Sequence, residues 1–326
     1  MKQRTLGRTG LAVSEIVFGG GWVGGILIHK DDDTKRAAIR RALDAGVNWI
    51  DTAPAYGDGK SEEALGWLLQ EVDAATRMST KVLLDLKRLD DIVGQVEHSL
   101  SGSLARLRRQ SVDLVFLHNP IAAVTNDQQI GIDHVIGPGG VLEAFEAMRD
   151  RGLVGHFGIT ALGDGPAVCA VLESGRIGAA QVYYNMLNPS AGHPVPAAWT
   201  GHDFTGLIAA CDKNNVGVMN IRTFAAGVIA TDQRTGREVI ITDQTGVAEE
   251  ERKAHAVFDA LGLDYGTRAQ TAVRFSLSNP EIACVVVGMA EYRHLEEALT
   301  AEQMGPLPAP AMATLNALYD TDFGRI

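Results

Sequence analysis

The sequence predicts a single (β/α)8 barrel, and three observations lead to this prediction. Short apolar runs alternate along the chain with longer stretches that have the periodicity of amphipathic helices. The alternation repeats eight times, which is the number of strand–helix units that closes such a barrel. The chain has 326 residues, a normal length for one barrel domain, and no linker or composition break divides it. We therefore expect one domain over residues 1–326.

The expected strands are mostly continuous apolar runs, as is typical of parallel strands that are covered on both faces. In chain order they are Ile16–Phe18, Val47–Asp51, Met78–Val82, Val112–His118, Gly155–Thr160, Ala179–Tyr184, Val216–Ile221 and Ile282–Val287.

Amphipathic stretches lie between these runs. The first, Thr34–Ala45, carries apolar residues at helical spacing and stops at Gly46, a typical helix end. The acidic run Asp31–Asp33 ahead of it is interpreted as a helix cap and not as a metal cluster. The other expected helices are Ser61–Gln70, His98–Arg109, Val141–Arg151, Gly165–Ser174 and Arg268–Ser278.

Three segments fall outside the repeat. Arg4–Glu15 contains a Gly-Arg-Thr-Gly turn and predicts a small hairpin ahead of the first barrel strand. Ile121–Gly140 and Thr231–Glu251 are polar and rich in Gly and Asp, and they predict long loops. Both follow barrel strands, so they belong on the carboxyl face, where barrel active sites lie. Together with Pro189–Asp203, they are expected to build the substrate pocket.

Composition excludes several classes of function. The 29 basic and 40 acidic residues give a formal charge of −11, which argues against nucleic acid or an anionic membrane as partner. The three cysteines, Cys169, Cys211 and Cys284, are widely spaced and indicate reduced thiols, not a zinc site. No signal core or membrane-length apolar stretch is present. We expect a cytoplasmic protein that acts on a small molecule without a metal, and a homo-oligomer is compatible with the sequence.

Four polar residues lie at the ends of successive expected strands. Asp51 closes the second strand, Tyr56 lies in the turn after it, Lys81 is near the end of the third, and His118 closes the fourth. Strand ends of a barrel converge on one mouth, so these side chains should meet. Lys87 follows another apolar run and is the alternative strand-end lysine.

The chemistry of these four groups is coherent. A tyrosine hydroxyl titrates near pH 10 when unperturbed, and a neighbouring ammonium favours its phenolate form. A carboxylate such as Asp51 would keep Lys81 charged and in place, and the His118 imidazole would hydrogen-bond the reacting oxygen. Tyr56 would then protonate a carbonyl oxygen as hydride reaches its carbon, or deprotonate an alcohol in the reverse direction.

Several motifs together resemble those of the aldo-keto reductases, and they cover nearly the whole chain in the order expected for that family. They are Gly7–Ser14, Asn48–Gly57, Ser61–Gly66, Ser103–Leu107, Val112–His118, Gly158–Thr160 and Gln181–Asn185. The resemblance implies a catalytic tetrad of Asp51, Tyr56, Lys81 and His118. It also implies hydride transfer with NADP or NAD, without metal, to or from an aldehyde, ketone, alcohol or sugar.

The resemblance also implies a cofactor lying across the barrel mouth. Residues beside the nicotinamide would be Gly21, Trp22, Asp51, Thr160 and Gln181, and Ile221 stands where many members stack a tyrosine. The pyrophosphate would contact Arg222, Phe224, Ala225 and Gly227, and the adenosine end would contact Gly288, Met289, His294 and Glu297. Arg293 would attract a 2′-phosphate and Glu291 would repel one, so the choice between NADP and NAD is open.

Three alternative interpretations of the sequence remain open. Gly19, Gly21 and Gly24 fit the GxGxxG pattern of an open dinucleotide-binding sheet, but no helix is expected at the third glycine. A different barrel enzyme would use Lys81 to form a Schiff base. Lastly, some barrels of this family serve as cofactor-sensing subunits, which would make the chain a binding module.

Overall fold

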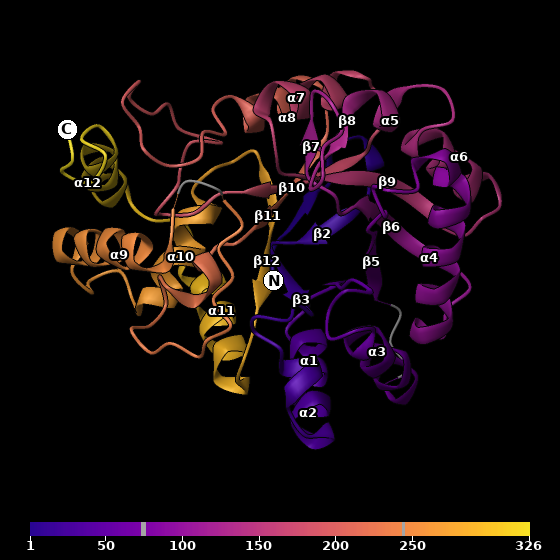
Figure 1. Ribbon diagram of the computed structural model, residues 1–326. Coiled ribbons are helices and arrows are strands. Elements are labelled where there is room, and N and C mark those ends of the chain that lie inside the picture. The colour runs from indigo at the N-terminus through magenta and orange to yellow at the C-terminus, as the bar shows by residue number, and fades with distance from the viewer. Residues whose placement is uncertain (73–75, 243–244) are drawn as a thin grey trace.

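The computed structural model describes residues 1–72, 76–242 and 245–326. Within these ranges, eight parallel strands close into a barrel (Figure 1). The ring closes where β12 pairs with β3, with Val285 opposite Ile16. The barrel strands are β3 (Ile16–Gly19), β4 (Trp49–Asp51), β5 (Arg77–Val82), β6 (Val112–Leu117), β9 (Val154–Ala161), β10 (Ala179–Tyr183), β11 (Gly217–Ile221) and β12 (Ile282–Gly288). The predicted fold and strands are confirmed.

Helices surround the strands on the outside, as Figure 1 shows. The predicted helices are present, but α4 begins at Ile92 and not at His98. The expected cap is also present, because the Asp31 carboxylate accepts a hydrogen bond from the Thr34 N–H at 2.9 Å. The helices are α1 (Ile26–His29), α2 (Asp32–Asp44), α3 (Lys60–Glu71), α4 (Ile92–Leu107), α5 (Ile132–Ile136), α6 (Val141–Asp150), α7 (Gly165–Glu173), α8 (Leu207–Lys213), α9 (Val247–Leu261), α10 (Arg268–Leu277), α11 (Tyr292–Met304) and α12 (Ala309–Tyr319).

Among the residues that the structure describes, two apolar cores stabilise the barrel. The larger core fills the layer between the strands and the surrounding helices. The smaller one lies inside the barrel and includes Val17, Trp49, Phe116 and Met219, all completely buried. Side chains therefore fill the barrel interior, which leaves ligands only the ends of the barrel.

The predicted N-terminal hairpin is present as β1 (Gln3–Thr5) paired antiparallel with β2 (Ala12–Ser14). Its turn is held against the amino end of the barrel by a hydrogen bond from the Arg8 N–H to the Asn215 carbonyl at 2.7 Å. Gly7 has a left-handed φ of 48°, and the backbone of Gly217 occupies the space that a Cβ would need. The hairpin thus lies at the end of the barrel opposite the expected site, against β10, β11 and β12.

The prediction of a plain loop over Ile121–Gly140 was wrong. This segment forms β7 (Ile121–Ala122), β8 (Ile130–Gly131) and α5. These elements are two to five residues long, too short to leave a periodic pattern in the sequence. The expected loop Thr231–Glu251 ends earlier than predicted, because α9 begins at Val247, and two of its residues, 243 and 244, lie outside the described residues.

The open dinucleotide-binding sheet is contradicted by the closed barrel. The glycine run after β3 leads only into α1, a single turn of four residues that had not been expected. In the part of the chain that the structure covers, no helix is both long and apolar enough to cross a membrane.

Candidate active site

The barrel brings the four predicted residues to its carboxyl mouth. Asp51 is the last residue of β4, and Lys81 is the next-to-last residue of β5. His118 follows β6 directly, and Tyr56 lies in the connection from β4 to α3. The register sets Asp51 opposite Ser79, two residues before Lys81 on β5.

Asp51 and Lys81 form a buried ion pair. The Lys81 ammonium lies 2.6 Å from the Asp51 carboxylate and also donates to the Thr52 carbonyl at 2.8 Å. The Lys81 side chain is 1% exposed, and the Asp51 side chain is 4% exposed. Burial opposes the charge on Lys81, but the Asp51 carboxylate and the Tyr56 phenol outweigh it, so the pKa of Lys81 lies above its usual value.

The second oxygen of Asp51 is also saturated. It accepts hydrogen bonds from the Ser79 hydroxyl at 2.7 Å and from the Gln181 amide at 2.8 Å. The Ser79 oxygen in turn accepts from the Trp49 indole N–H at 3.1 Å. These contacts fix the orientation of Asp51, and they satisfy the charge of a carboxylate that water cannot reach.

Tyr56 lies between Lys81 and His118. The Lys81 ammonium is 4.8 Å from the centre of the Tyr56 ring, and the His118 ring approaches edge-on with centroids 6.1 Å apart. Lys87, the alternative lysine, is exposed in the loop after β5. The register of β5 therefore selects Lys81 as the lysine beside Tyr56.

His118 is half-buried and stays neutral in the ordinary pH range. Burial, together with the positive charges of Lys81 and Arg222, lowers the pKa of His118 to about 3. Its Nδ1 atom has no hydrogen-bond partner among the described residues. A neutral imidazole with a free nitrogen can orient a ligand oxygen, but it cannot store a proton as a cation near pH 7.

The loop after β3 presents an open surface to the mouth. An added Cβ on Gly21 would meet nothing within 4 Å, and the next residue, Trp22, is 40% exposed. Gly24 differs, because a Cβ there would lie 2.5 Å from the Met289 N atom. Gly21 thus leaves open space in which a ligand could lie, and Gly24 allows the loop after β3 to contact the backbone of Met289.

Thr160 and Gln181 face each other in the register of β9 and β10. The Thr160 hydroxyl is buried and has no partner within the described chain. The Gln181 amide already donates to Asp51. Of the two residues expected near the nicotinamide amide, Thr160 therefore has an unused polar atom, and Gln181 links that region to the tetrad.

The loop after β11 has an unusual backbone. Arg222, Ala225 and Ala226 have left-handed φ values of 62°, 44° and 58°. The Asn185 amide holds the Arg222 carbonyl at 2.9 Å, and the Arg222 guanidinium donates to the Val239 carbonyl at 2.6 Å. Non-glycine residues in this conformation cost energy and tend to occur at functional sites. Phe224 and Gly227 lie in the same turn, and Ile221 ends β11.

A buried acidic residue beside this loop escaped the sequence analysis. Glu250 of α9 is 4% exposed, and one of its carboxylate oxygens has no hydrogen-bond partner among the described residues. Burial raises its pKa to about 7, although Thr245, Lys253 and Arg222 act in the other direction. The phenol of Tyr183 is a further neighbour of the Glu250 carboxylate. No sequence signal pointed to Glu250, because a charged residue in the first turn of an amphipathic helix is ordinarily solvated.

The expected adenosine region lies between β12 and α11. An added Cβ on Gly288 would meet nothing within 4 Å, and the His294 ring accepts a hydrogen bond from the Ala290 N–H at 3.2 Å. Glu291 forms an ion pair with Lys30 at 2.6 Å, a partner that the sequence analysis missed. Arg293 is exposed and Glu297 is half-buried. Lys30 therefore offsets the repulsion that Glu291 would exert on a phosphate.

The three loops expected to shape a substrate pocket do meet. They line a cavity of about 310 Å³ beside the ends of β6 and β9. The residues drawn from them are Asn126, Gln128, Gln129, His202 and Ile241. The wall therefore combines amide and imidazole groups with apolar surface.

Comparison with known proteins places the chain in a family. The model of the aldo/keto reductase family matches residues 15–320. L-galactose dehydrogenase of Arabidopsis thaliana is 25% identical over 91% of this chain and 87% of its own length. A probable voltage-gated potassium channel subunit beta of Oryza sativa is also 25% identical, over 95% and 94% of the two chains.

A solved structure shares the fold. The holo form of aldo-keto reductase AKR11C1 from Bacillus halodurans superposes with a TM-score of 0.75, at 21% identity. The match covers 98% of this chain and 97% of that one.

Proposed function

Because the chain belongs to the aldo/keto reductase family and is thus an NAD(P)-dependent oxidoreductase, we propose that Tyr56 exchanges the proton of the reacting oxygen. The observation that carries this proposal is the position of Tyr56 between a buried, charged Lys81 and a neutral His118. A nicotinamide cofactor supplies or accepts the hydride when bound. The unused Thr160 hydroxyl and the open face of Gly21 fit such a group.

Each residue of the tetrad then has a separate task. Asp51 keeps Lys81 charged and in place through the 2.6 Å ion pair. Lys81 stabilises the phenolate that Tyr56 becomes after it gives its proton to a carbonyl oxygen. His118 donates or accepts a hydrogen bond at that oxygen and remains uncharged throughout. In the oxidising direction, the Tyr56 phenolate accepts the proton of an alcohol.

We further propose that the substrate is a sugar or a similar polyhydroxylated molecule. The cavity beside β6 and β9 offers amides from Asn126, Gln128 and Gln129, which can pair with several hydroxyl groups. Phe204 and Leu162 supply apolar surface for the carbon face of a ring. The similarity to L-galactose dehydrogenase supports the same substrate class.

The structure gives little support to a Schiff base on Lys81. An amine must lose its proton before it attacks a carbonyl, whereas the Lys81 ammonium is held by two oxygens within 2.8 Å and its pKa is raised. Treatment with borohydride and a carbonyl substrate should therefore leave no covalent adduct on Lys81.

The Tyr56→Phe variant tests the role of Tyr56. We expect the turnover of aldoses with NADP or NAD to fall by a factor of about 100 to 10,000, because general acid–base catalysis is lost. Cofactor affinity, measured from the quenching of tryptophan fluorescence, should change little. Unchanged turnover would overturn the assignment. A native protein that binds cofactor but turns over no carbonyl or alcohol would favour the cofactor-sensing subunit.

A further inference from the structure

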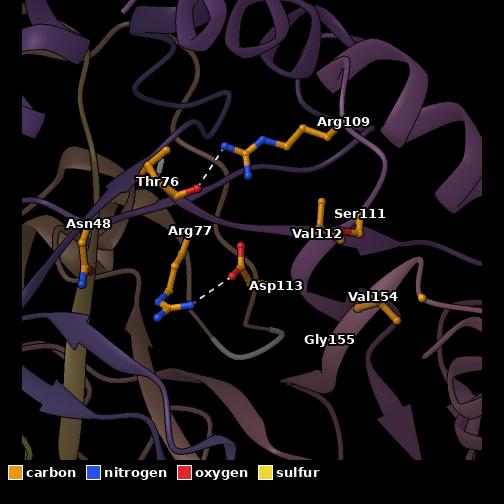
Figure 2. Close-up of a pocket in the computed structure, with 10 residues that line it drawn as sticks. Asn48, Thr76, Arg77, Arg109, Ser111, Val112, Asp113, Val154 and Gly155 are labelled. Carbon is orange, nitrogen blue, oxygen red and sulfur yellow. Dashed lines mark hydrogen bonds and ion pairs between the residues drawn. The ribbon is translucent and has the colours of Figure 1, made fainter. Parts of the chain in front are cut away.

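A second cavity lies at the amino end of the barrel, opposite the mouth that holds Tyr56. Its volume is about 770 Å³, within the range of small-molecule sites. Its lining comes from the amino ends of β5, β6 and β9, with Thr76 just before β5, Arg109 and Ser111 before β6, Gly152 before β9 and Asn48 before β4. Figure 2 shows Arg109 extending toward Thr76 and Arg77 pointing toward Asp113 across this cavity. None of these residues takes part in the proposed reaction.

The cavity has more positive than negative charge. Arg77 lies 3.2 Å from Asp113, and the other oxygen of Asp113 accepts from the Met78 N–H at 2.9 Å. Arg109 donates to the Thr76 carbonyl at 3.0 Å, and in the described chain no carboxylate lies within ion-pair distance of it. The lining thus carries two guanidinium groups and one carboxylate, and that carboxylate is already engaged on both oxygens, by Arg77 and by the Met78 N–H.

Arg109 remains charged in this position. Burial lowers the pKa of its guanidinium and Asp113 raises it, but an arginine does not lose its proton in a protein near neutral pH. Within the described residues, Arg109 donates one hydrogen bond, and a half-buried cation of this kind favours an anionic ligand, because the planar guanidinium matches the oxygens of a carboxylate or phosphate.

A buried hydroxyl adds an independent sign of a ligand. Thr76 is 5% exposed, lines the cavity, and has an Oγ1 atom without a partner among the described residues. A buried polar atom left without a hydrogen bond is destabilising, and a bound oxyanion or its water would satisfy it. A Cβ on Gly155, another lining residue, would lie 3.0 Å from the Asp113 carbonyl, so the backbones of the two strands approach closely at the edge of the cavity.

We propose that this cavity binds a small molecule carrying a phosphate or carboxylate group, with Arg109 and Arg77 as its cationic partners and Thr76 as an additional donor. The protein as a whole carries a charge of −11, so its general field does not attract anions. The attraction is local to these residues. The site is separate from the barrel mouth, where the phosphates of the cofactor are expected.

Calorimetric titration of the full chain, saturated with NADPH, tests this proposal. Inorganic phosphate and acetate are titrated separately, with chloride keeping the ionic strength constant. We expect saturable binding of at least one anion, and the stronger one identifies the ligand group. Arg109→Gln should weaken that binding about tenfold or more, because a charge-assisted pair contributes roughly 1.5–3 kcal/mol.

Two variants serve as references. Arg40→Gln removes an exposed arginine on α2 and should bind the anion as tightly as the native chain. If Arg109→Gln does not fold, Arg109→Lys keeps the charge without the planar fork and should still bind several-fold more weakly. No saturable binding of either anion, or equal binding by the native chain and the folded Arg109 variant, would overturn the proposal.

Discussion

The Lys81 ammonium and the Asp51 carboxylate lie 2.6 Å apart inside the barrel mouth, and both side chains are almost completely buried. Neither charge can be solvated by water if its partner is removed. The pair is therefore a structural element as well as part of the proposed catalytic machinery, and its two roles can be separated by mutation.

Asp51→Asn should leave Lys81 buried without its counter-ion. We expect a loss of about 3 kcal/mol in the free energy of unfolding, because removing one partner of a buried pair typically costs 3–5 kcal/mol. The double variant Asp51→Asn, Lys81→Met should recover part of this stability, since no uncompensated charge remains. Neither variant should turn over substrate. Urea unfolding and steady-state rates measure the two effects, and a double variant less stable than Asp51→Asn would contradict the pairing argument.

His118 should make the protein sensitive to acid. A histidine of the unfolded chain titrates near pH 6.5, whereas His118 in the fold titrates at about 3. Between these values the unfolded chain binds a proton that the folded chain excludes. The contribution of His118 to the free energy of unfolding therefore falls as the pH is lowered through this window, by up to about 1.4 kcal/mol per pH unit. Urea midpoints of the native chain and of His118→Gln, measured from pH 6.5 to 4.5, should diverge accordingly.

Glu250 should act in the opposite sense. Its pKa of about 7 in the fold lies above the 4.5 of an ordinary glutamate, so the folded chain binds the extra proton between these values. Its contribution to stability is present below pH 4.5 and is lost as the pH rises toward 7. Glu250→Gln should be more stable relative to the native chain at pH 7.5 than at pH 5. A stability difference independent of pH would show that Glu250 does not titrate in this range.

Lys30 should become available to a phosphate when Glu291 is neutralised. The ion pair is partly exposed, with side chains 32% and 47% exposed, so breaking it costs little. We expect Glu291→Gln to tighten NADPH binding by roughly threefold to tenfold and to leave NADH binding unchanged, because only NADPH carries the 2′-phosphate. Glu296→Gln is the matched control, since Glu296 lies in the first turns of α11, just after Glu291, but pairs with Arg41. Equal effects of the two variants on NADPH would place the 2′-phosphate elsewhere.

The C-terminal residues should position one wall of the substrate pocket. Asp322 is buried and accepts from the Thr200 hydroxyl at 2.6 Å, and the buried Lys253 ammonium is 3.6 Å away. The same ammonium lies 4.5 Å from the Trp199 ring. Asp322→Asn should lower the free energy of unfolding by about 3 kcal/mol, because it leaves Lys253 buried and unpaired.

The same variant should raise KM for the substrate more than it lowers kcat, and cofactor affinity should be preserved. Lys213→Gln breaks an exposed ion pair with Glu173 and should change each quantity little. Equal changes in KM for the two variants would argue against a specific role for Asp322.

The sequence predicted the barrel strands within two residues because buried parallel strands are continuous apolar runs with clear ends. It failed over 121–140, where β7, β8 and α5 are stabilised by the surrounding structure and not by their own periodicity. Local sequence favoured Lys81 over Lys87, and the structure places the Lys81 ammonium 4.8 Å from the centre of the Tyr56 ring.

Other site residues could not have been predicted. Glu250 and Lys253 lie on a helix whose pattern is that of an ordinary surface helix. Lys253 is buried because the C-terminal segment packs over α9, where Arg252 donates to the Phe323 carbonyl at 3.0 Å. Glu250 instead faces Tyr183 and Arg222 of the barrel. A contact between segments so far apart in the chain does not alter the local hydrophobic pattern, so the sequence could not predict it.

The pairing of β3 with β12 also has a consequence for how the protein is made in the cell. Val285 is the partner of Ile16, so the first barrel strand cannot complete its pairing until the last strand has been synthesised. Until then, the nascent chain presents an open strand edge and an unfilled interior to its surroundings. Contacts of such long sequence separation slow folding and expose a chain to aggregation. Synthesis of this protein should therefore depend on chaperones more strongly than the stability of its finished barrel would suggest.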